Sequence, residues 1–533
     1  MTDRGVAEVV ITGSDVTPDT VEAVARRGAT VGLDPDARAR IQRSRDVVER
    51  LVAEGAVVYG VTTGVGALAD QTIEPADAAR LQENLLLSHA AGVGDPLPRE
   101  IVRAMLLLRA NTLALGYSGV RPVVVERLLD FLNRGIHPVV PAQGSVGASG
   151  DLAPLAHLAL PVIGHGHAEL GGHAMPGILA LREAGLEPLT LGPKEGLALL
   201  NGTQLMTALG ALLAADAERL LRTASVAAAM SVEALLGTDV AFSDALLQVR
   251  PHPGQVRVAA ELRWLLRGSG LQQAHHGSAH KVQDPYSLRC APQVHGASRD
   301  ALDHLRRVLA IEMNAATDNP LIFPDGQVSD AAARATGGGL VISGGNFHGE
   351  PVAQALDFAK IGLTELASIS ERRVALLFDP RLNGDLPPFL AGRSGLEAGL
   401  MLLQYTAAAL VSECKVLAHP ASVDSIPTSA NQEDHVSMGP IAGRHARAVL
   451  EAAERVVAIE LLCAAQALDL RLEQAEFAGI RPGAGVREAH ARVRAVARRW
   501  DGDREPGPDL EAATRLVHEG SLAELADPAS GPA

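Results

Sequence analysis

Beyond about residue 193 the sequence becomes a succession of long helical patterns, which limits the folds that the chain can adopt. Apolar residues recur at helical spacing over residues 301–316, up to the helix-breaking sequence Thr317-Asp318-Asn319-Pro320. Three further patterns, each longer than a typical globular helix, cover residues 350–378, 396–418 and 438–475. Long helices with few strands are typical of a helical bundle, so we expect a mainly α protein with a long central bundle.

The N-terminal part of the chain has shorter and more varied patterns. It predicts a strand, a helix and a turn over residues 7–33, and a small β element around residues 166–175. The helical patterns before residue 136 cover residues 35–54, 76–91 and 98–135. Residues 324–342 are rich in glycine and predict a mobile loop. We expect a smaller N-terminal domain over residues 1–220, and a long-helix bundle with a C-terminal helical cap over residues 221–533.

Composition and charge narrow the class of protein. The chain has 533 residues and a formal net charge of −15, which argues against a nucleic-acid partner because such partners normally need a basic surface. The three cysteines lie far apart, which indicates a reducing compartment rather than a disulfide framework or a zinc site. The sequence contains neither a secretory signal pattern nor an apolar run long enough to cross a bilayer. We therefore expect a cytoplasmic protein that binds no membrane.

Two groups of histidines could suggest a metal site by their number alone. They are His165, His167 and His173, and His275, His276 and His280. Neither group has a nearby cysteine or a clear carboxylate that would orient the imidazole rings. We therefore predict that the protein binds no metal.

Several glycine-rich or polar segments interrupt the helical patterns. One of them reads GSVGASGDLAPLAH over residues 144–157 and includes Ala148-Ser149-Gly150. The tripeptide alone indicates little, because it recurs at Ala529-Ser530-Gly531 and would also suit a turn or a helix start. The other segments are YGVTTGVG (59–66), LQENLLLSHAAGVG (81–94), EGLALLNGTQ (195–204), VQDPYSLRCAPQV (282–294), SGGNFHGEP (343–351) and SANQEDHVSMGP (429–440), together with Asn319.

These segments, in this order, resemble the aromatic amino acid ammonia-lyase/aminomutase family that uses the electrophile 4-methylidene-imidazol-5-one (MIO). The resemblance covers about residues 7 to 520. The strings Ser88-His89-Ala90-Ala91-Gly92 and Gln432-Glu433-Asp434-His435 bring it nearest to the members that act on histidine. It implies a long helical bundle of the fumarase/aspartase-like type. It also implies a homotetramer whose active sites combine loops from three chains.

The resemblance implies that the protein makes its own electrophile from Ala148-Ser149-Gly150 and needs no external cofactor. The nitrogen of Gly150 would attack the carbonyl carbon of Ala148, and glycine permits this close backbone approach because it has no Cβ. Ser149 would then lose water across Cα–Cβ and leave a methylidene group. The sequence leaves open whether the amine or the ring of the substrate attacks this group. A fumarase-type lyase and an inactive helical scaffold are the alternatives, although the chain lacks the serine-loop signature of the former.

The resemblance also assigns catalytic roles. Tyr59 would remove the β-proton of the substrate, and Tyr286 would assist proton movement near MIO. Glu433 would either bind imidazole or compete with Tyr59 as the base. From the residues alone, a tyrosine on a glycine-rich loop can act as a general base, but it can also be a turn aromatic that packs against the core.

Five further residues are candidates for substrate binding. Arg289 suits a bidentate clamp on an α-carboxylate, whereas a lone arginine more often forms a surface ion pair. Asn201 and Gln283 are amides that could hold a carboxylate or the oxygen of MIO, or could be satisfied buried amides. The resemblance puts Asn201 beside the MIO oxygen and puts Gln283 and Asn319 near the substrate. It adds Phe347 to the same site.

His89 and Glu433 bear on the choice of substrate. An imidazole ring needs partners for two nitrogens, whereas a phenyl ring needs none, so a histidine and a carboxylate in one pocket favour imidazole. Alternatively, His89 could form a hydrogen bond within its own helix and Glu433 could pair with a cation. We expect elimination of ammonia from L-histidine to give trans-urocanate. A phenylalanine or tyrosine ammonia-lyase, or an aminomutase, is the alternative.

Overall fold

The computed structural model describes residues 8–66, 71–275, 282–324 and 341–528, and most of the loop predicted at 324–342 lies outside these ranges. The chain forms two compact units, each assembled from three stretches of sequence. Unit 1 contains residues 1–212, 305–356 and 420–444, and unit 2 contains residues 213–304, 357–419 and 445–533. Four of the five boundaries between the units fall within long helices, and the fifth lies in the loop after residue 417. The predicted domain division at residue 220 stays a prediction.

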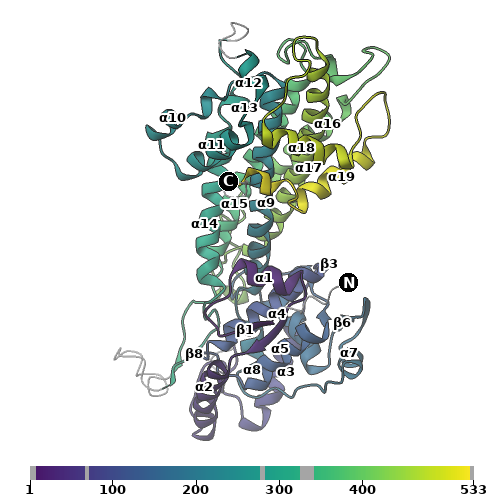
Figure 1. The fold of residues 1–533 in the computed structure, drawn as a ribbon. Coiled ribbons are helices and arrows are strands. Elements are labelled where there is room, and N and C mark those ends of the chain that lie inside the picture. The colour runs from purple at the N-terminus through teal and green to yellow at the C-terminus, as the bar shows by residue number, and fades with distance from the viewer. Residues whose placement is uncertain (1–7, 67–70, 276–281, 325–340, 529–533) are drawn as a thin grey trace. The chain divides into compact units, whose positions relative to one another are not determined.

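Unit 1 begins with the predicted strand, helix and turn. Strands β1 (Glu8–Ile11) and β2 (Thr30–Leu33) pair in parallel, and α1 (Pro18–Ala25) connects them. Helix α1 starts where the hydroxyl of Thr17 accepts a hydrogen bond from the Thr20 amide, directly before a proline at the first helical position. Figure 1 shows this purple N-terminal part of the chain.

The helices of unit 1 confirm most of the predicted helical ranges. They are α2 (Pro35–Ala53), α3 (Ala78–His89), α4 (Arg99–Ala114), α5 (Pro122–Arg134), α6 (Leu152–Ala159), α7 (Gly177–Glu183) and α8 (Glu195–Leu200). Every residue of α4 from Ile101 onward is buried, so this helix forms the centre of the unit 1 core. Helix α5 ends at Gly135, whose φ of 70° terminates the helix in the left-handed region that glycine tolerates.

Short strands complete unit 1. They are β3 (Val93–Pro96), β4 (His137–Pro138), β5 (Pro141–Gln143), β6 (His167–Leu170), β7 (His173–Pro176), β8 (Leu321–Ile322) and β9 (Val341–Ile342). Strands β4, β6 and β7 form an antiparallel sheet, which confirms the β element predicted around residues 166–175. Strand β5 pairs with β3 and leads directly into the segment that contains Ala148-Ser149-Gly150.

Four long helices contribute to unit 2, and their lengths confirm the predicted bundle. They are α9 (Gln204–Ala234), α14 (Ala291–Glu312), α15 (Glu350–Phe378) and α17 (Gly439–Glu473). Within unit 2 they lie side by side (Figure 1). Glu460 of α17 accepts hydrogen bonds from Ser231 of α9 and Ser370 of α15. Arg373 of α15 also contacts His295 of α14 at 3.3 Å.

The remaining helices of unit 2 are shorter. They are α10 (Asp244–Gln248), α11 (Pro253–Leu266), α12 (Gly270–His275), α13 (Tyr286–Arg289), α16 (Met401–Leu417), α18 (Ala484–Val496) and α19 (Gly507–His518). None of the helices in the described ranges combines the length and the hydropathy that a membrane span requires. The chain is thus mainly α, as the sequence predicts.

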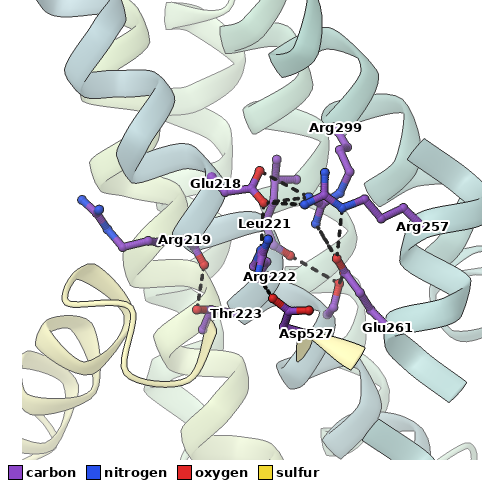
Figure 2. Close-up of polar contacts among 10 residues, drawn as sticks. Glu218, Arg219, Leu221, Arg222, Thr223, Arg257, Glu261, Arg299 and Asp527 are labelled. Carbon is purple, nitrogen blue, oxygen red and sulfur yellow. Dashed lines mark hydrogen bonds and ion pairs between the residues drawn. The ribbon is translucent and has the colours of Figure 1, made fainter. Parts of the chain in front are cut away.

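A network of ion pairs joins helices within unit 2, as Figure 2 shows. Glu218 of α9 accepts hydrogen bonds from Arg222 at 2.8 Å, from Arg257 at 2.9 Å and from Arg299 at 3.2 Å. Arg299 also pairs with Glu261 of α11 at 3.0 Å. Removing one partner from a buried network leaves an uncompensated charge, so these groups make the packing of α9, α11 and α14 specific.

Candidate functional site

A cavity of about 890 Å³ lies within unit 1, at the ends of several helices and loops. Eight of the predicted site residues line it: Tyr59, His89, Ala148, Ser149, Asn201, Asn319, Phe347 and Glu433. Leucines from α3 and α8 supply part of an apolar wall. Among the described residues that line the cavity there is no lysine or arginine. The cavity therefore combines an apolar surface with a few polar groups, as small-molecule sites usually do.

The Ala148-Ser149-Gly150 segment forms a tight turn at the cavity wall. Gly150 has a φ of 73°, and a Cβ built on it would lie only 2.1 Å from the carbonyl oxygen of Gly202. No side chain fits there, so this position requires glycine both for its conformation and for its close approach to Gly202. On the other side, the Ser437 hydroxyl donates to the carbonyl oxygen of Gly147 at 3.0 Å. The turn is therefore held from both flanks.

Asn201 holds the carbonyl oxygen of the serine in this turn. Its Nδ2 donates to Ser149 O at 3.0 Å. Arg109 in turn fixes the backbone of Asn201, because its Nη1 donates to the carbonyl oxygens of Asn201 at 2.8 Å and Ala198 at 2.9 Å. Burial lowers the pKa of Arg109 to about 10, so the guanidinium still carries its charge at neutral pH.

Asp151 anchors the C-terminal side of the turn to the start of α9. Its Oδ2 accepts hydrogen bonds from the amides of Leu205 at 2.8 Å and Met206 at 3.2 Å, and its own amide donates to Gly202 O at 2.7 Å. Helix N-termini favour a carboxylate, but burial is the larger effect and raises the pKa of Asp151 to about 7. The position of the turn is thus coupled to α9.

Tyr59 reaches the cavity from the loop that follows α2. Gly60 makes this loop possible, because it has a φ of 67° and a Cβ on it would lie 2.4 Å from the side chain of Leu197. The Tyr59 hydroxyl oxygen accepts a hydrogen bond from the Gly66 amide at 3.1 Å. The phenol oxygen is therefore held in place at the cavity wall.

His89 is the last residue of α3, and its ring has a defined orientation. Nδ1 lies 2.8 Å from the carbonyl oxygen of Leu85 and 3.1 Å from the hydroxyl oxygen of Ser88. Because a carbonyl oxygen can only accept, Nδ1 must carry a proton for the contact with Leu85. In the neutral ring Nε2 is then a hydrogen-bond acceptor. The hydrogen bond within the helix, weighed above as an alternative to ligand binding, is therefore present and leaves Nε2 available.

Glu433 approaches the turn from residues 429–435. Its Oε1 accepts a hydrogen bond from the Ser149 hydroxyl at 2.9 Å, across 284 residues of sequence. Its Oε2 accepts a hydrogen bond from the Thr428 hydroxyl at 2.7 Å. The side chain is half-buried, and both oxygens are held by hydroxyl groups.

Asn319 connects two cavity-lining segments. Its Oδ1 accepts a hydrogen bond from the Gly344 amide at 2.8 Å, and its Nδ2 donates to the Ser343 hydroxyl at 3.2 Å. The preceding residue, Asp318, forms a fully buried ion pair with Lys194 at 2.6 Å. These contacts hold the segment that carries Phe347 against the cavity.

The predicted residues Gln283, Tyr286 and Arg289 belong to unit 2 and do not line the cavity. Tyr286 is 71% exposed, and the Arg289 guanidinium lies 4.5 Å from the centre of its ring. The Nε of Arg289 donates to the carbonyl oxygen of Asp284 at 3.0 Å. Tyr286 and Arg289 therefore contact each other in α13 (Tyr286–Arg289), outside the cavity lining.

Two histidines line the cavity that the sequence analysis did not select. His348 and His435 lie with their ring centres 5.9 Å apart, and His348 Nε2 lies 3.2 Å from the carbonyl oxygen of His435. His348 follows the predicted Phe347, and His435 lies two residues after the predicted Glu433, so their positions in the sequence indicate the site. Within the described residues no group of three or more metal-ligating side chains comes together.

Comparison with known proteins places the chain in a family. A family model described as aromatic amino acid lyase matches residues 16–495. A protein named histidine ammonia-lyase from Symbiobacterium thermophilum is 53% identical over 526 residues, which are 98% of this chain and 99% of that protein. A protein of the same name from Anaeromyxobacter dehalogenans is 54% identical over 522 residues, which are 96% of this chain and 99% of that protein.

Solved structures agree with this match. The crystal structure of histidine ammonia-lyase from Trypanosoma cruzi is 43% identical, with a TM-score of 0.88, and covers 98% of this chain and 95% of that chain. A tyrosine aminomutase from Streptomyces globisporus is 37% identical, with a TM-score of 0.89, and covers 97% of this chain and 98% of that chain. These similarities confirm the resemblance read from the sequence. The chain belongs to the aromatic amino acid lyase family.

Proposed function

We propose that this protein eliminates ammonia from L-histidine and releases trans-urocanate. The observation that carries the proposal is that His89 and Glu433 line the same cavity as Ser149. His89 Nε2 and the carboxylate of Glu433 are two acceptors, which suit the two N–H donors of an imidazolium ring. A phenyl ring offers no N–H donor to either group. The relatives named histidine ammonia-lyase support the same choice of substrate.

The Ala148-Ser149-Gly150 segment fits the formation of MIO, on which this family in general depends. Gly150 has the left-handed backbone and the absence of a Cβ that ring closure needs. Asn201 already donates to the Ser149 oxygen, which is the oxygen that the closed ring would retain. When formed, MIO would supply an electrophile that no standard side chain provides.

The residues of the cavity divide the remaining work. We assign Tyr59 as the base for the β-proton, because its hydroxyl lines the cavity and is held by the Gly66 amide. We assign Glu433 to imidazole recognition. Formation of MIO removes the Ser149 hydroxyl, which leaves Oε1 of Glu433 without that donor and free to accept an N–H of the substrate.

The substrate carboxylate needs a cationic partner that the described lining of the cavity does not contain. We propose that Arg289, with Gln283 and Tyr286, reaches the cavity from other copies of the chain in a homotetramer. The exposed apolar side chains of α16 support such assembly. Leu402 is 53% and Tyr405 is 63% exposed, and large apolar side chains exposed close together on one helix are typical of protein–protein contacts.

We also propose a cytoplasmic location. The three cysteines form no disulfide, which suits a reducing compartment. Burial raises the pKa of Cys414 to about 11, so this thiol is a packing residue rather than a reactive one.

Turnover of L-histidine, L-phenylalanine and L-tyrosine, followed side by side by UV absorbance, tests the proposed substrate. We expect trans-urocanate from L-histidine and at most traces of product from the other two amino acids. The intact mass of the same preparation should fall short of the sequence mass by two waters. A full-length sequence mass would contradict the MIO assignment, and a faster reaction with either other amino acid would contradict the substrate assignment.

Mixing two inactive variants tests whether the site is shared between copies. Ser149→Ala and Arg289→Ala should each be inactive alone. If Arg289 acts on the cavity of another copy, co-assembled mixtures should regain a measurable fraction of activity, because some sites then contain both intact residues. Mixtures that stay inactive after verified exchange of subunits would contradict a shared site.

A further inference from the structure

Thr428 contacts Glu433 through both backbone and side chain. The Thr428 amide donates to Glu433 O at 3.0 Å, and the Glu433 amide donates to Thr428 O at 3.3 Å. The Thr428 hydroxyl adds the third contact, to Oε2 of Glu433 at 2.7 Å. The two residues therefore close a short loop, and the carboxylate lies at the point of closure.

The backbone inside this loop is strained. Ser429, Ala430 and Asn431 all lie in the left-handed region, with φ values of 50°, 52° and 67°. This region is unfavourable for a residue with a side chain and is seldom occupied by consecutive residues. Such strain persists only where surrounding contacts fix the conformation, and it clusters at functional sites. The contacts between Thr428 and Glu433 are the ones that close this loop.

The Thr428 hydroxyl is suited to orienting Glu433. Thr428 does not line the cavity, whereas Glu433 does, so the Thr428 hydroxyl can act on a bound ligand through the carboxylate that it contacts. No lysine or arginine of the described chain pairs with Glu433, and its two oxygens have hydroxyl donors instead. Because Oε2 is held by Thr428, rotation of the carboxylate is restricted and Oε1 points toward Ser149.

We propose that Thr428 is a positioning residue that orients the Glu433 carboxylate and thereby sets the preference for an imidazole ring over a phenyl ring. The proposal rests on the proposed function, because it requires that Glu433 bind imidazole. Its chemistry is specific to the hydroxyl: serine keeps the donor, and valine keeps the shape of threonine but removes the donor.

Equilibrium binding of trans-urocanate and trans-cinnamate to Thr428→Val and Thr428→Ser tests the proposal, together with kcat and KM for L-histidine. Loss of a hydrogen bond to a charged group weakens binding by roughly 10-fold. We expect Thr428→Val to raise the Kd of trans-urocanate and the KM of L-histidine by about this factor, with the Kd of trans-cinnamate unchanged. Thr428→Ser should restore wild-type values.

A double-mutant cycle with Glu433→Gln separates positioning from a general structural effect. If Thr428 acts through the carboxylate, Thr428→Val should change the Kd of trans-urocanate much less in the Glu433→Gln background than in the wild type. Thr514→Val is the matched control, because it removes a hydroxyl that donates to a helix carbonyl in α19. The control should leave both Kd values unchanged.

The outcomes distinguish this inference from the proposed function. If Glu433→Gln weakens trans-urocanate binding but Thr428→Val does not, the role of Thr428 is wrong and the proposed function stands. The same holds if Thr428→Ser is as impaired as Thr428→Val, or if the two substitutions are additive. If Glu433→Gln leaves trans-urocanate binding unchanged, the imidazole assignment fails and the role of Thr428 fails with it.

Discussion

Two carboxylates, one in each unit, are held by hydroxyl groups in different ways. Glu460 in unit 2 is fully buried, accepts hydrogen bonds from Ser231 and Ser370, and also pairs with Arg373 through Nε at 2.6 Å and Nη2 at 2.8 Å. Glu433 in unit 1 also accepts two hydroxyl donors but has no guanidinium partner among the described residues.

The difference separates a structural carboxylate from one that can bind a ligand. Each oxygen of Glu460 has two donors, so a bound molecule could gain nothing there. Each oxygen of Glu433 has one donor, and the donor to Oε1 is the hydroxyl that MIO formation would remove. Unit 2 therefore uses its buried charges to fix helix packing, whereas unit 1 keeps acceptors available at a cavity.

Ser149→Ala should have the largest effect on activity. Without the hydroxyl no methylidene can form, so we expect kcat to fall by at least about 10³-fold, the scale of an essential catalytic group. The intact mass should then fall short of the sequence mass by fewer than two waters. Thermal unfolding should stay near that of the wild type, because residue 149 lines a cavity rather than a packed core. Activity like that of the wild type would contradict the assignment of Ser149 to MIO.

Arg373→Met should have its main effect on stability rather than on activity. It leaves Glu460 buried without its cation, and such a loss costs about 3–5 kcal/mol of unfolding free energy. Urea titration measures this change, with Arg372→Met as the control because that arginine is 62% exposed. A stability equal to that of the control would show that the Glu460 charge does not need its partner.

Glu433→Gln should affect activity more than stability. Glutamine keeps the size of the side chain but offers one acceptor oxygen and no charge, so imidazole recognition should weaken. We expect kcat/KM for L-histidine to fall by about 10²-fold, or ~2.7 kcal/mol, with urea unfolding unchanged. A loss of stability comparable to that of Arg373→Met would mean that Glu433 is structural as well.

The sequence predicted the long helices better than it predicted the site geometry. The apolar period of residues 350–378 depends only on local spacing, and α15 has these limits in the structure. The contact between Ser149 and Glu433 joins residues 284 positions apart, which no local pattern encodes. The left-handed backbone of Ser429-Ala430-Asn431 was equally inaccessible, because none of these residues is glycine and tertiary contacts impose the conformation.

Thr428 shows how a residue can be missed for the same reason. It stands one position before the quoted segment SANQEDHVSMGP and carries no motif of its own. Its proposed role follows only from the loop that brings its hydroxyl to Glu433. The polar residues of the site could be listed from the sequence, but the groups that orient them depend on the folded chain.

A third carboxylate, Glu233 in unit 2, should have the smallest effect, which is on how the unfolding free energy depends on pH. It accepts a hydrogen bond from the Gly483 amide but pairs with no cation among the described residues, and burial raises its pKa to about 7. The folded protein thus holds this proton more tightly than the unfolded chain does. The stabilising contribution is complete below the unfolded pKa of about 4.3 and is lost as pH rises through about 7. Wild-type stability should therefore fall by roughly 1–3 kcal/mol between pH 5 and pH 8 relative to Glu233→Gln, as measured by urea unfolding. Parallel pH profiles for the two proteins would mean that Glu233, like Glu460, is held as a charged group in the core.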